Sequence, residues 1–198
     1  MATADMLQAT LHAFATHGYT GVSVRLLNQG LGVSHNLIYQ RFGTKQNLWR
    51  AAVDHGFGEL LELLNTDVGT TDPLDELSYL IRGFVIFSAA HPDLLGLVDI
   101  ESRQDTDRLR YLYAEYIQPA LQRVSSVLDR LVSAGRIRPV PLYLLHFLLT
   151  HGAVAPFTLV PMGALVDAPA AGDDAAVRRY ADEVAGLIIR GLQISAVD

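Results

Sequence analysis

Side chains suited to DNA gather in a short stretch near the start of the chain. The amide of Asn36 can form two hydrogen bonds with adenine, and the imidazole of His35 can donate to or accept from a purine edge. Hydroxyl, guanidinium and ammonium groups bind the oxygens of phosphates. The residues that could contact DNA in these ways are Ser23, Arg25, Ser34, His35, Asn36, Tyr39, Arg41 and Lys45. The chemistry expected of them is the binding of double-stranded DNA.

Six of these residues, all except His35 and Asn36, also have a purely structural interpretation. Ser23 and Ser34 are typical helix caps, and Tyr39 could be partly buried with only its hydroxyl reaching DNA. The basic residues, taken singly, would be ordinary solvated charges. Their clustering in an otherwise acidic chain favours DNA binding.

The charge of the chain is divided unevenly along its length. Its 198 residues include 15 basic and 21 acidic side chains, and the net charge of −6 by itself argues against a nucleic-acid partner. The first fifty residues hold four basic residues and one acidic residue, a net charge of +3, so the remainder has −9. This asymmetry predicts a small head that faces DNA and an acidic body that stands away from it.

Helical periodicity predicts the elements that position these side chains. Apolar residues indicate a first helix that stops at Gly18, and Thr44 is expected to cap a long fourth one. Between them, Ser23 begins one short helix and Ser34 another, with a glycine turn separating the two. This layout is a helix-turn-helix, whose second helix enters the major groove and reaches base edges with its early residues, Ser34, His35, Asn36 and Tyr39.

The rest of the chain shows helical periodicity as well. Asp72-Pro73 predicts the start of a helix that ends at His91-Pro92, and another segment runs from Asp93 towards Gln104. A long helix is expected from Leu109 to just before Gly135, kinked or split by Pro119.

Two helices are expected near the C-terminus. Residues 142–155 are almost wholly apolar but shorter than the about 20 residues of a membrane span, so they predict a buried or subunit-facing helix and no membrane association. After a loop at residues 167–172, an apolar stripe from Val177 to Leu192 predicts the last helix. The sequence thus predicts an all-α protein.

Several classes of function are disfavoured. The chain has no cysteine, which excludes disulfides, zinc ribbons and cysteine nucleophiles. It lacks the GxSxG, HExxH, Walker and GxGxxG motifs, so we expect no enzyme, catalytic residue, metal or cofactor. The first twenty residues do not form a signal peptide, and we expect a cytoplasmic protein.

The N-terminal stretch resembles the DNA-binding domain of the tetracycline-repressor (TetR) family over about residues 4–50. The matching runs are Ala13-Phe14, Gly18-Tyr19-Thr20-Gly21-Val22-Ser23-Val24-Arg25, Leu31-Gly32-Val33-Ser34 and Tyr39-Gln40-Arg41-Phe42-Gly43-Thr44-Lys45. The resemblance implies an all-helical, homodimeric regulator with a helix-turn-helix domain at residues 1–48 and an effector-binding and dimerisation domain at residues 49–198.

The resemblance also implies roles for single residues. Ser23 and Arg25 would contact the DNA backbone at the edge of the groove. His35 and Asn36 would read bases, and Tyr39 and Lys45 would hold phosphates.

The stretch departs from the family pattern in two places. Asn28 stands where the family usually has a small residue, which bears on how the two short helices pack. His35-Asn36-Leu37 replaces the more common Lys-Gly-Thr, which bears on the operator sequence.

An effector cavity is implied between the helices near residues 73–135, with dimer contacts from residues 142–155 and 175–193. The candidate ligand contacts are Phe84, Phe87, Arg103, Tyr113, Tyr116 and His146. Core packing is the alternative role for each of them. Their apolar character suggests a small hydrophobic or aromatic effector.

The sequence therefore predicts a ligand-responsive repressor that binds a palindromic operator as a homodimer. The alternative is a DNA-bound scaffold that recruits a protein partner and has no small-molecule switch.

Overall fold

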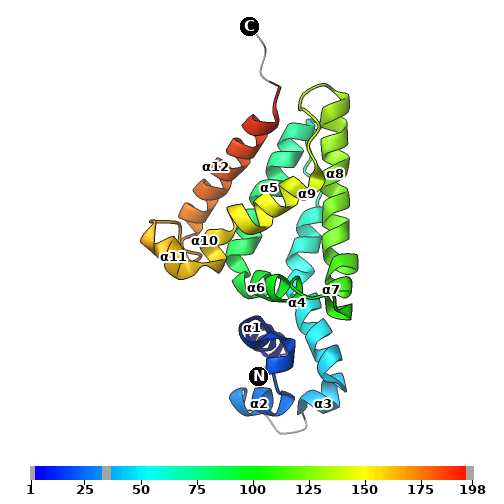
Figure 1. Ribbon diagram of the computed structural model, residues 1–198, viewed down its shortest axis with the longest axis vertical. Helices are drawn as coiled ribbons and strands as arrows, with labels where there is room; N and C mark the ends of the chain where they lie inside the picture. Colours follow the sequence, from blue (N-terminus) through cyan, green and yellow to red (C-terminus); the bar gives the residue numbers. More distant parts are fainter. Residues whose placement is uncertain (1–2, 33–36, 195–198) are drawn as a thin grey trace. The chain divides into compact units, whose positions relative to one another are not determined.

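The computed structural model describes residues 3–32 and 37–194, and this part of the chain is helical, without a strand. The N-terminal elements are α1 (Thr3–Gly21), α2 (Val24–Gly30), α3 (Leu37–Phe42) and α4 (Lys45–Asn65). The middle elements are α5 (Pro73–Ala90), α6 (Pro92–Glu101), α7 (Asp107–Leu112), the π-helical turn η1 (Tyr113–Ile117) and α8 (Gln118–Ser133). The C-terminal elements are α9 (Leu142–Phe147), the π-helical turn η2 (Leu148–Ala153), α10 (Ala155–Thr158), α11 (Val160–Leu165) and α12 (Asp174–Leu192) (Figure 1). The predicted all-α class is confirmed.

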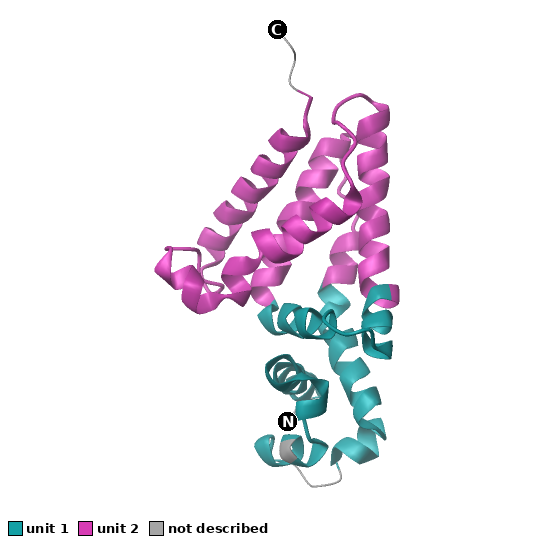
Figure 2. Ribbon diagram, in the orientation of Figure 1, with its two compact units in different colours: residues 1–59, 91–113 teal, residues 60–90, 114–198 magenta. Residues whose placement is uncertain are grey.

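The helices form two compact units (Figure 2). The first unit contains residues 1–59 and 91–113, so that α6 and α7 join the N-terminal helices. The second unit contains residues 60–90 and 114–198. Helix α4 begins in the first unit and ends in the second. The expected functional boundary at residue 48 stays a prediction, because packing does not define where DNA binding ends.

The core of the first unit is built where α1 packs along α6. Its largest fully buried side chains include Trp49, Phe14, Met6, Leu11, Ile38, Leu94 and Leu97. Gly56 of α4 lets these helices approach closely, since a Cβ atom there would lie 3.2 Å from side-chain atoms of both Leu11 and Leu94. The same packing holds α4 in place, and Lys45, the candidate for phosphate binding, is the first residue of this helix.

The helix starts and ends predicted for the first part of the chain are confirmed in part. Gly18 interrupts the regular geometry of α1 with a φ of 66°, as its position predicted. Thr44 caps α4, because the Asn47 backbone N–H donates to its Oγ1 at 3.1 Å. Ser23 lies at the N-cap of α2, but its hydroxyl makes no capping hydrogen bond to a described residue, so that part of the prediction is wrong. The predicted cap at Ser34 lies outside the described residues.

Asn28, the departure from the family pattern, is fully buried on α2. An amide in this position must find hydrogen-bonding partners in the interior, which a small apolar residue would not require. The packing around α2 therefore accommodates a buried polar group.

Pro119 changes the hydrogen-bonding pattern of the predicted long helix. Proline has no N–H to donate, and its ring crowds the carbonyl four residues earlier, here that of Glu115. The wider turn η1 precedes it directly, and Ile117 keeps helical dihedral angles of −73° and −46°. The predicted interruption thus takes the form of a π turn within a continuing helix.

In the second unit, α5 lies between α8 and α12 (Figure 1). Apolar side chains of α5, such as the fully buried Leu77 and Val85, face this interior. Glu76 is buried as well, and its carboxylate forms ion pairs with Arg130 and, at 2.6 Å, with Arg123 of α8. These pairs give α5 and α8 a fixed register, because a buried carboxylate must keep its partners.

The apolar stretch at residues 142–155 is divided into α9, η2 and the start of α10 rather than forming one helix. Leu145, Leu149 and Val154 are buried on one side of it. Its other side is exposed in the single chain, where 68% of the Tyr143 side chain and 56% of Phe147 are accessible. Full burial is therefore not observed, and the subunit-facing alternative stays a prediction.

Within the described residues, no single helix has both the length and the hydropathy needed to cross a bilayer. The consecutive helices α5 and α6 meet that test only when they are taken together.

Candidate nucleic-acid interface

The predicted phosphate-binding residues lie on or beside the short helices α2 and α3 and at the start of the long helix α4. Arg25 is exposed on α2, and Ser23 is exposed just before it. Tyr39 and Arg41 are exposed on α3, beside Ile38, which is buried and anchors that helix. The predicted base-reading residues Ser34, His35 and Asn36 lie outside the described residues.

Tyr39 has 53% of its side chain exposed, so its ring as well as its hydroxyl is accessible. Burial in the core is therefore not its role. Arg41 reaches from α3 to the start of α1, where its Nη1 donates to Thr3 Oγ1 at 3.1 Å. This bond orients α3 against α1 and leaves the guanidinium at the surface.

Lys45 opens α4, where backbone N–H groups without helical partners favour an anion. The turn before it is fixed by Asn47, whose Nδ2 donates to the carbonyl oxygen of Phe42 at 3.0 Å. Gly43 has a φ of 72°, which brings the chain sharply from α3 into α4. Lys45 therefore directly follows a hydrogen-bonded turn, and it is close in sequence to the exposed Tyr39.

The Lys45 ammonium is less free than the sequence suggests. It lies 4.4 Å from the ring centroid of Tyr19, in a cation–π contact. Partial burial, and to a smaller extent the charge of Arg108, lower the pKa of Lys45 from its usual range. The Arg108 guanidinium lies over the same ring, 4.0 Å from the centroid.

Tyr19 and Arg108 were not among the predicted site residues. Tyr19 is part of the matching N-terminal run, but that pattern does not say what its ring contacts. Arg108 lies 63 residues after Lys45 in the chain, in a segment whose overall charge is negative. Only the packing of α6 and α7 within the first unit reveals their connection with Lys45.

The six candidate effector contacts are divided between the units. Phe87 and Tyr116 are buried in the second unit, where Phe84 and His146 are half-buried. Arg103 and Tyr113 belong to the first unit and are exposed, and Arg103 donates to Asp99 at 2.7 Å one turn earlier on α6. The assignment of these six residues to an effector site stays a prediction.

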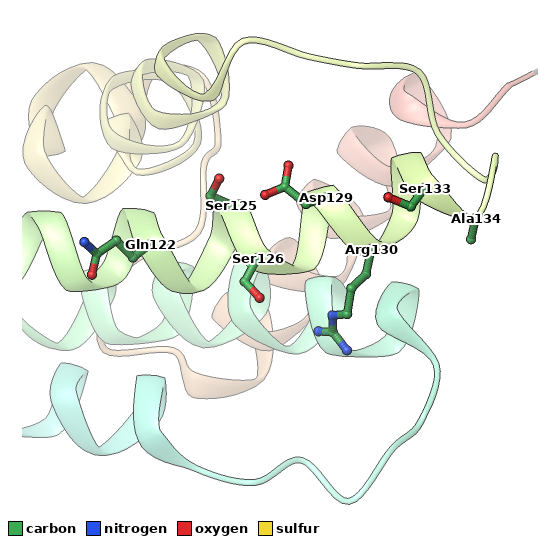
Figure 3. A pocket seen from close by; sticks show the side chains of 7 residues that line it. All are labelled: Gln122, Ser125, Ser126, Asp129, Arg130, Ser133 and Ala134. Carbon is green, nitrogen blue, oxygen red and sulfur yellow. The ribbon is translucent and has the colours of Figure 1, made fainter.

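A pocket of about 750 Å³ lies along α8 in the second unit (Figure 3). It is lined by Gln122, Ser125, Ser126, Asp129, Arg130, Ser133 and Ala134. Most of these residues are exposed, and Arg130 points away from Asp129 towards its ion pair with Glu76. This pocket is an open groove whose lining residues are mostly of polar types, and it includes none of the six candidate effector contacts.

Two family models match the chain. Residues 6–52 match "Bacterial regulatory proteins, tetR family", and residues 73–188 match "Tetracyclin repressor-like, C-terminal domain", which alone covers more than half of the chain. The chain belongs to the TetR family. It is a DNA-binding transcriptional regulator and not an enzyme.

Individual relatives agree with this assignment. The HTH-type transcriptional repressor AcnR of Corynebacterium glutamicum is 26% identical over 149 residues, which cover 73% of this TetR-family chain and 74% of AcnR. The TetR-family regulator PfmR of Thermus thermophilus has a TM-score of 0.70 at 18% identity, covering 98% of this chain and 99% of its own. The regulator FadR of Bacillus subtilis, solved with stearoyl-CoA, has a TM-score of 0.67 at 19% identity, covering 95% and 98%. Both structures show the shared fold.

Proposed function

We propose that this TetR-family regulator is a repressor that binds a palindromic operator as a homodimer and is released by a hydrophobic effector. The observation that supports DNA contact most directly is the placement of Lys45 at the start of α4, together with the exposure of Arg25 on α2 and Tyr39 on α3, the two helices that precede it. An ammonium at a helix N-terminus and a hydroxyl on the helix before it suit adjacent phosphate oxygens. Such a regulator acts in the cytoplasm, where its DNA is.

Base recognition is assigned to His35 and Asn36 from the sequence. An α-helix in the major groove presents its early residues to base edges, and an Asn amide matches adenine. The purified protein, incubated with sheared genomic DNA, should retain a small set of fragments that share an inverted repeat. Retention of fragments without any shared sequence would contradict the proposal.

Replacing Asn36 with alanine should relax the base preference at one position of each half-site. The loss of a bidentate contact costs about 1–3 kcal/mol of discrimination against the wrong base. The measurement is the affinity for the operator and for single-base variants of it, with fluorescence anisotropy as the readout. If the variant weakens binding to all sequences equally, Asn36 does not read a base.

Dimerisation is supported by apolar side chains that the single chain leaves exposed in the second unit. They include Tyr143, Leu144, Phe147 and Leu148 on α9 and η2, and Leu187 on α12. The first four recur at helical spacing and thus share one side of the segment. A second copy of this chain would cover them and would place two recognition helices about 34–36 Å apart, one turn of DNA.

The effector is proposed to be hydrophobic, because the candidate contacts in the second unit, Phe84, Phe87 and Tyr116, are aromatic. The binding of stearoyl-CoA by FadR, a protein of the same fold, supports a ligand with an acyl chain. Release from the operator requires a coupling of about 1–3 kcal/mol, or 5- to 150-fold in affinity.

A panel of acyl-CoA thioesters and free fatty acids tests the effector in two ways. A ligand that binds the folded state raises the melting temperature, and an effector also weakens operator binding. If no ligand of the panel does either, and a protein partner is retained only by the DNA-bound form, the scaffold alternative is correct.

His146 is expected to make the stability of the second unit depend on pH. Burial, and then the charge of His151, hold the pKa of His146 below its usual range, so the unfolded chain takes up a proton more readily than the folded one. The stabilisation is complete above the unfolded pKa of about 6.5 and is lost as the pH falls from there towards the lowered value. The melting temperature of the wild type should therefore fall between about pH 7.5 and 5.5, and that of His146→Gln should fall less.

The matched control is His55→Gln, which removes an exposed histidine from α4. Its melting temperature should fall with pH as in the wild type. An equal decrease for all three proteins would show that His146 does not produce the dependence.

A further inference from the structure

Tyr19 is the meeting point of two cations in the first unit. Its ring lies beneath Lys45 of α4 and Arg108 of α7, with 4.4 Å and 4.0 Å from the ring centroid to the two charged groups. The ring is itself held by Phe14 of α1, which stacks with it at 5.8 Å between centroids and 13° between planes. A ring fixed in this way is a platform whose position determines where the Lys45 ammonium lies.

Arg108 is held in place by a carboxylate rather than by solvent. Its Nε donates to Glu101 Oε1 at 2.8 Å, and the side chains of Arg108 and Glu101 are only 21% and 5% exposed. The other oxygen of Glu101 accepts from the Thr106 hydroxyl at 3.2 Å. Thr106 also caps α7 by accepting from the Leu109 N–H at 3.1 Å. The turn between α6 and α7 therefore gives Arg108 a fixed position.

Holding Lys45 and Arg108 over one ring costs free energy, so we ask what the arrangement does for Lys45. Two like charges over one ring repel each other, and burying the Glu101 carboxylate requires that its partners stay in place. A solvated lysine at the start of α4 would need neither Arg108 nor Glu101. The contacts instead restrict the lysine, which lowers the conformational entropy lost when its ammonium binds a phosphate.

We propose that Arg108 is a positioning residue that, through the ring of Tyr19, orients Lys45 for binding a DNA phosphate. In this proposal Arg108 does not contact phosphate itself, because its guanidinium is engaged by the Glu101 carboxylate and the Tyr19 ring. The affinity of Lys45 for a phosphate then depends on the position of the turn between Glu101 and Arg108, because this turn places the Arg108 side chain. This inference rests on the proposed DNA-binding function and adds a residue outside the helix-turn-helix to it.

The test is the replacement of Arg108 with methionine, which keeps the apolar stem and removes the guanidinium. Operator affinity should fall about 3- to 10-fold, the entropy cost of immobilising one long side chain on binding. The slope of log affinity against log salt should stay that of the wild type, because no phosphate contact is removed. Arg108→Met should also add nothing to Lys45→Met, since both changes disable the same contact.

The matched control is Arg110→Met on the same helix, where Arg110 pairs instead with Asp105 at 2.8 Å and Asp107 at 3.3 Å. Operator affinity should stay within about twofold of the wild type, the small effect expected of an exposed ion pair. An equal loss for Arg108→Met and Arg110→Met, or a loss that adds to that of Lys45→Met, would overturn the proposal. A lower salt slope for Arg108→Met would also overturn it and identify Arg108 as a phosphate contact.

Tyr19 offers a second route if Arg108→Met fails to fold. Tyr19→Phe keeps the aromatic face and should bind the operator nearly as the wild type does, whereas Tyr19→Leu should reproduce the loss and the unchanged slope. Equal affinities of these two variants contradict the role of the ring. The two failures can be told apart. If the wild type retains no specific DNA, the proposed function is wrong, whereas the comparisons between variants test only the role of Arg108 and Tyr19.

Discussion

Replacing Phe147 with glutamate should convert the proposed dimer to a monomer and abolish tight operator binding. Phe147 lies on the exposed apolar side of α9, and 56% of its side chain is accessible in the single chain. A second copy that covers this side would have to desolvate the new carboxylate, which costs several kcal/mol. Operator affinity should then fall by about 100-fold or more, towards the non-specific range of 10⁻⁴–10⁻⁶ M.

Sedimentation analysis and fluorescence anisotropy on the operator measure the two effects. The matched control is Ser126→Glu, which adds the same charge at an exposed position of the polar groove on α8. It should remain dimeric and bind normally. If Phe147→Glu stays dimeric with full affinity, residues 142–153 do not form the interface.

Replacing Lys45 with methionine should weaken binding to operator and unrelated DNA alike. The ammonium is assigned to a phosphate, which every sequence offers, so base preference should be unchanged. Each lysine that neutralises a phosphate releases counterions on binding, and the salt slope should therefore fall by about one per subunit. Affinity titrations between about 50 and 200 mM salt give this slope directly.

Arg50→Met is the matched control for Lys45→Met. Arg50 lies on the same helix and is exposed, and its guanidinium lies 4.8 Å from the ring centroid of Tyr111. Its removal should leave the salt slope unchanged. A wild-type slope for Lys45→Met would exclude Lys45 from the phosphate contacts.

Much of the fold could be predicted because its signals are local. Thr44 caps the helix that follows it, and the Asp72 carboxylate accepts from the Leu74 N–H at 2.8 Å at the start of α5. Glycine at position 18 ends regular helix through a dihedral angle that other residues rarely adopt. Such features depend on residues within a few positions of one another, so the sequence contains them completely.

The predictions that failed or fell short depended on packing. Ser23 occupies the expected position, but its hydroxyl does not make the expected cap, since cap geometry depends on the path by which the chain enters the helix. Residues 142–155 have the composition of a buried helix. The structure exposes one side of them, because burial depends on which neighbours cover each face.

The family, the all-α class and the residue types available for DNA could all be predicted from the amino-acid sequence, because they follow from short motifs and helical periodicity. The sequence did not reveal that Arg108 shares the ring of Tyr19 with Lys45. These three residues come together only in the folded first unit, where α1 packs against α6. Contacts between residues so distant in sequence arise from the fold as a whole, and no local pattern encodes them.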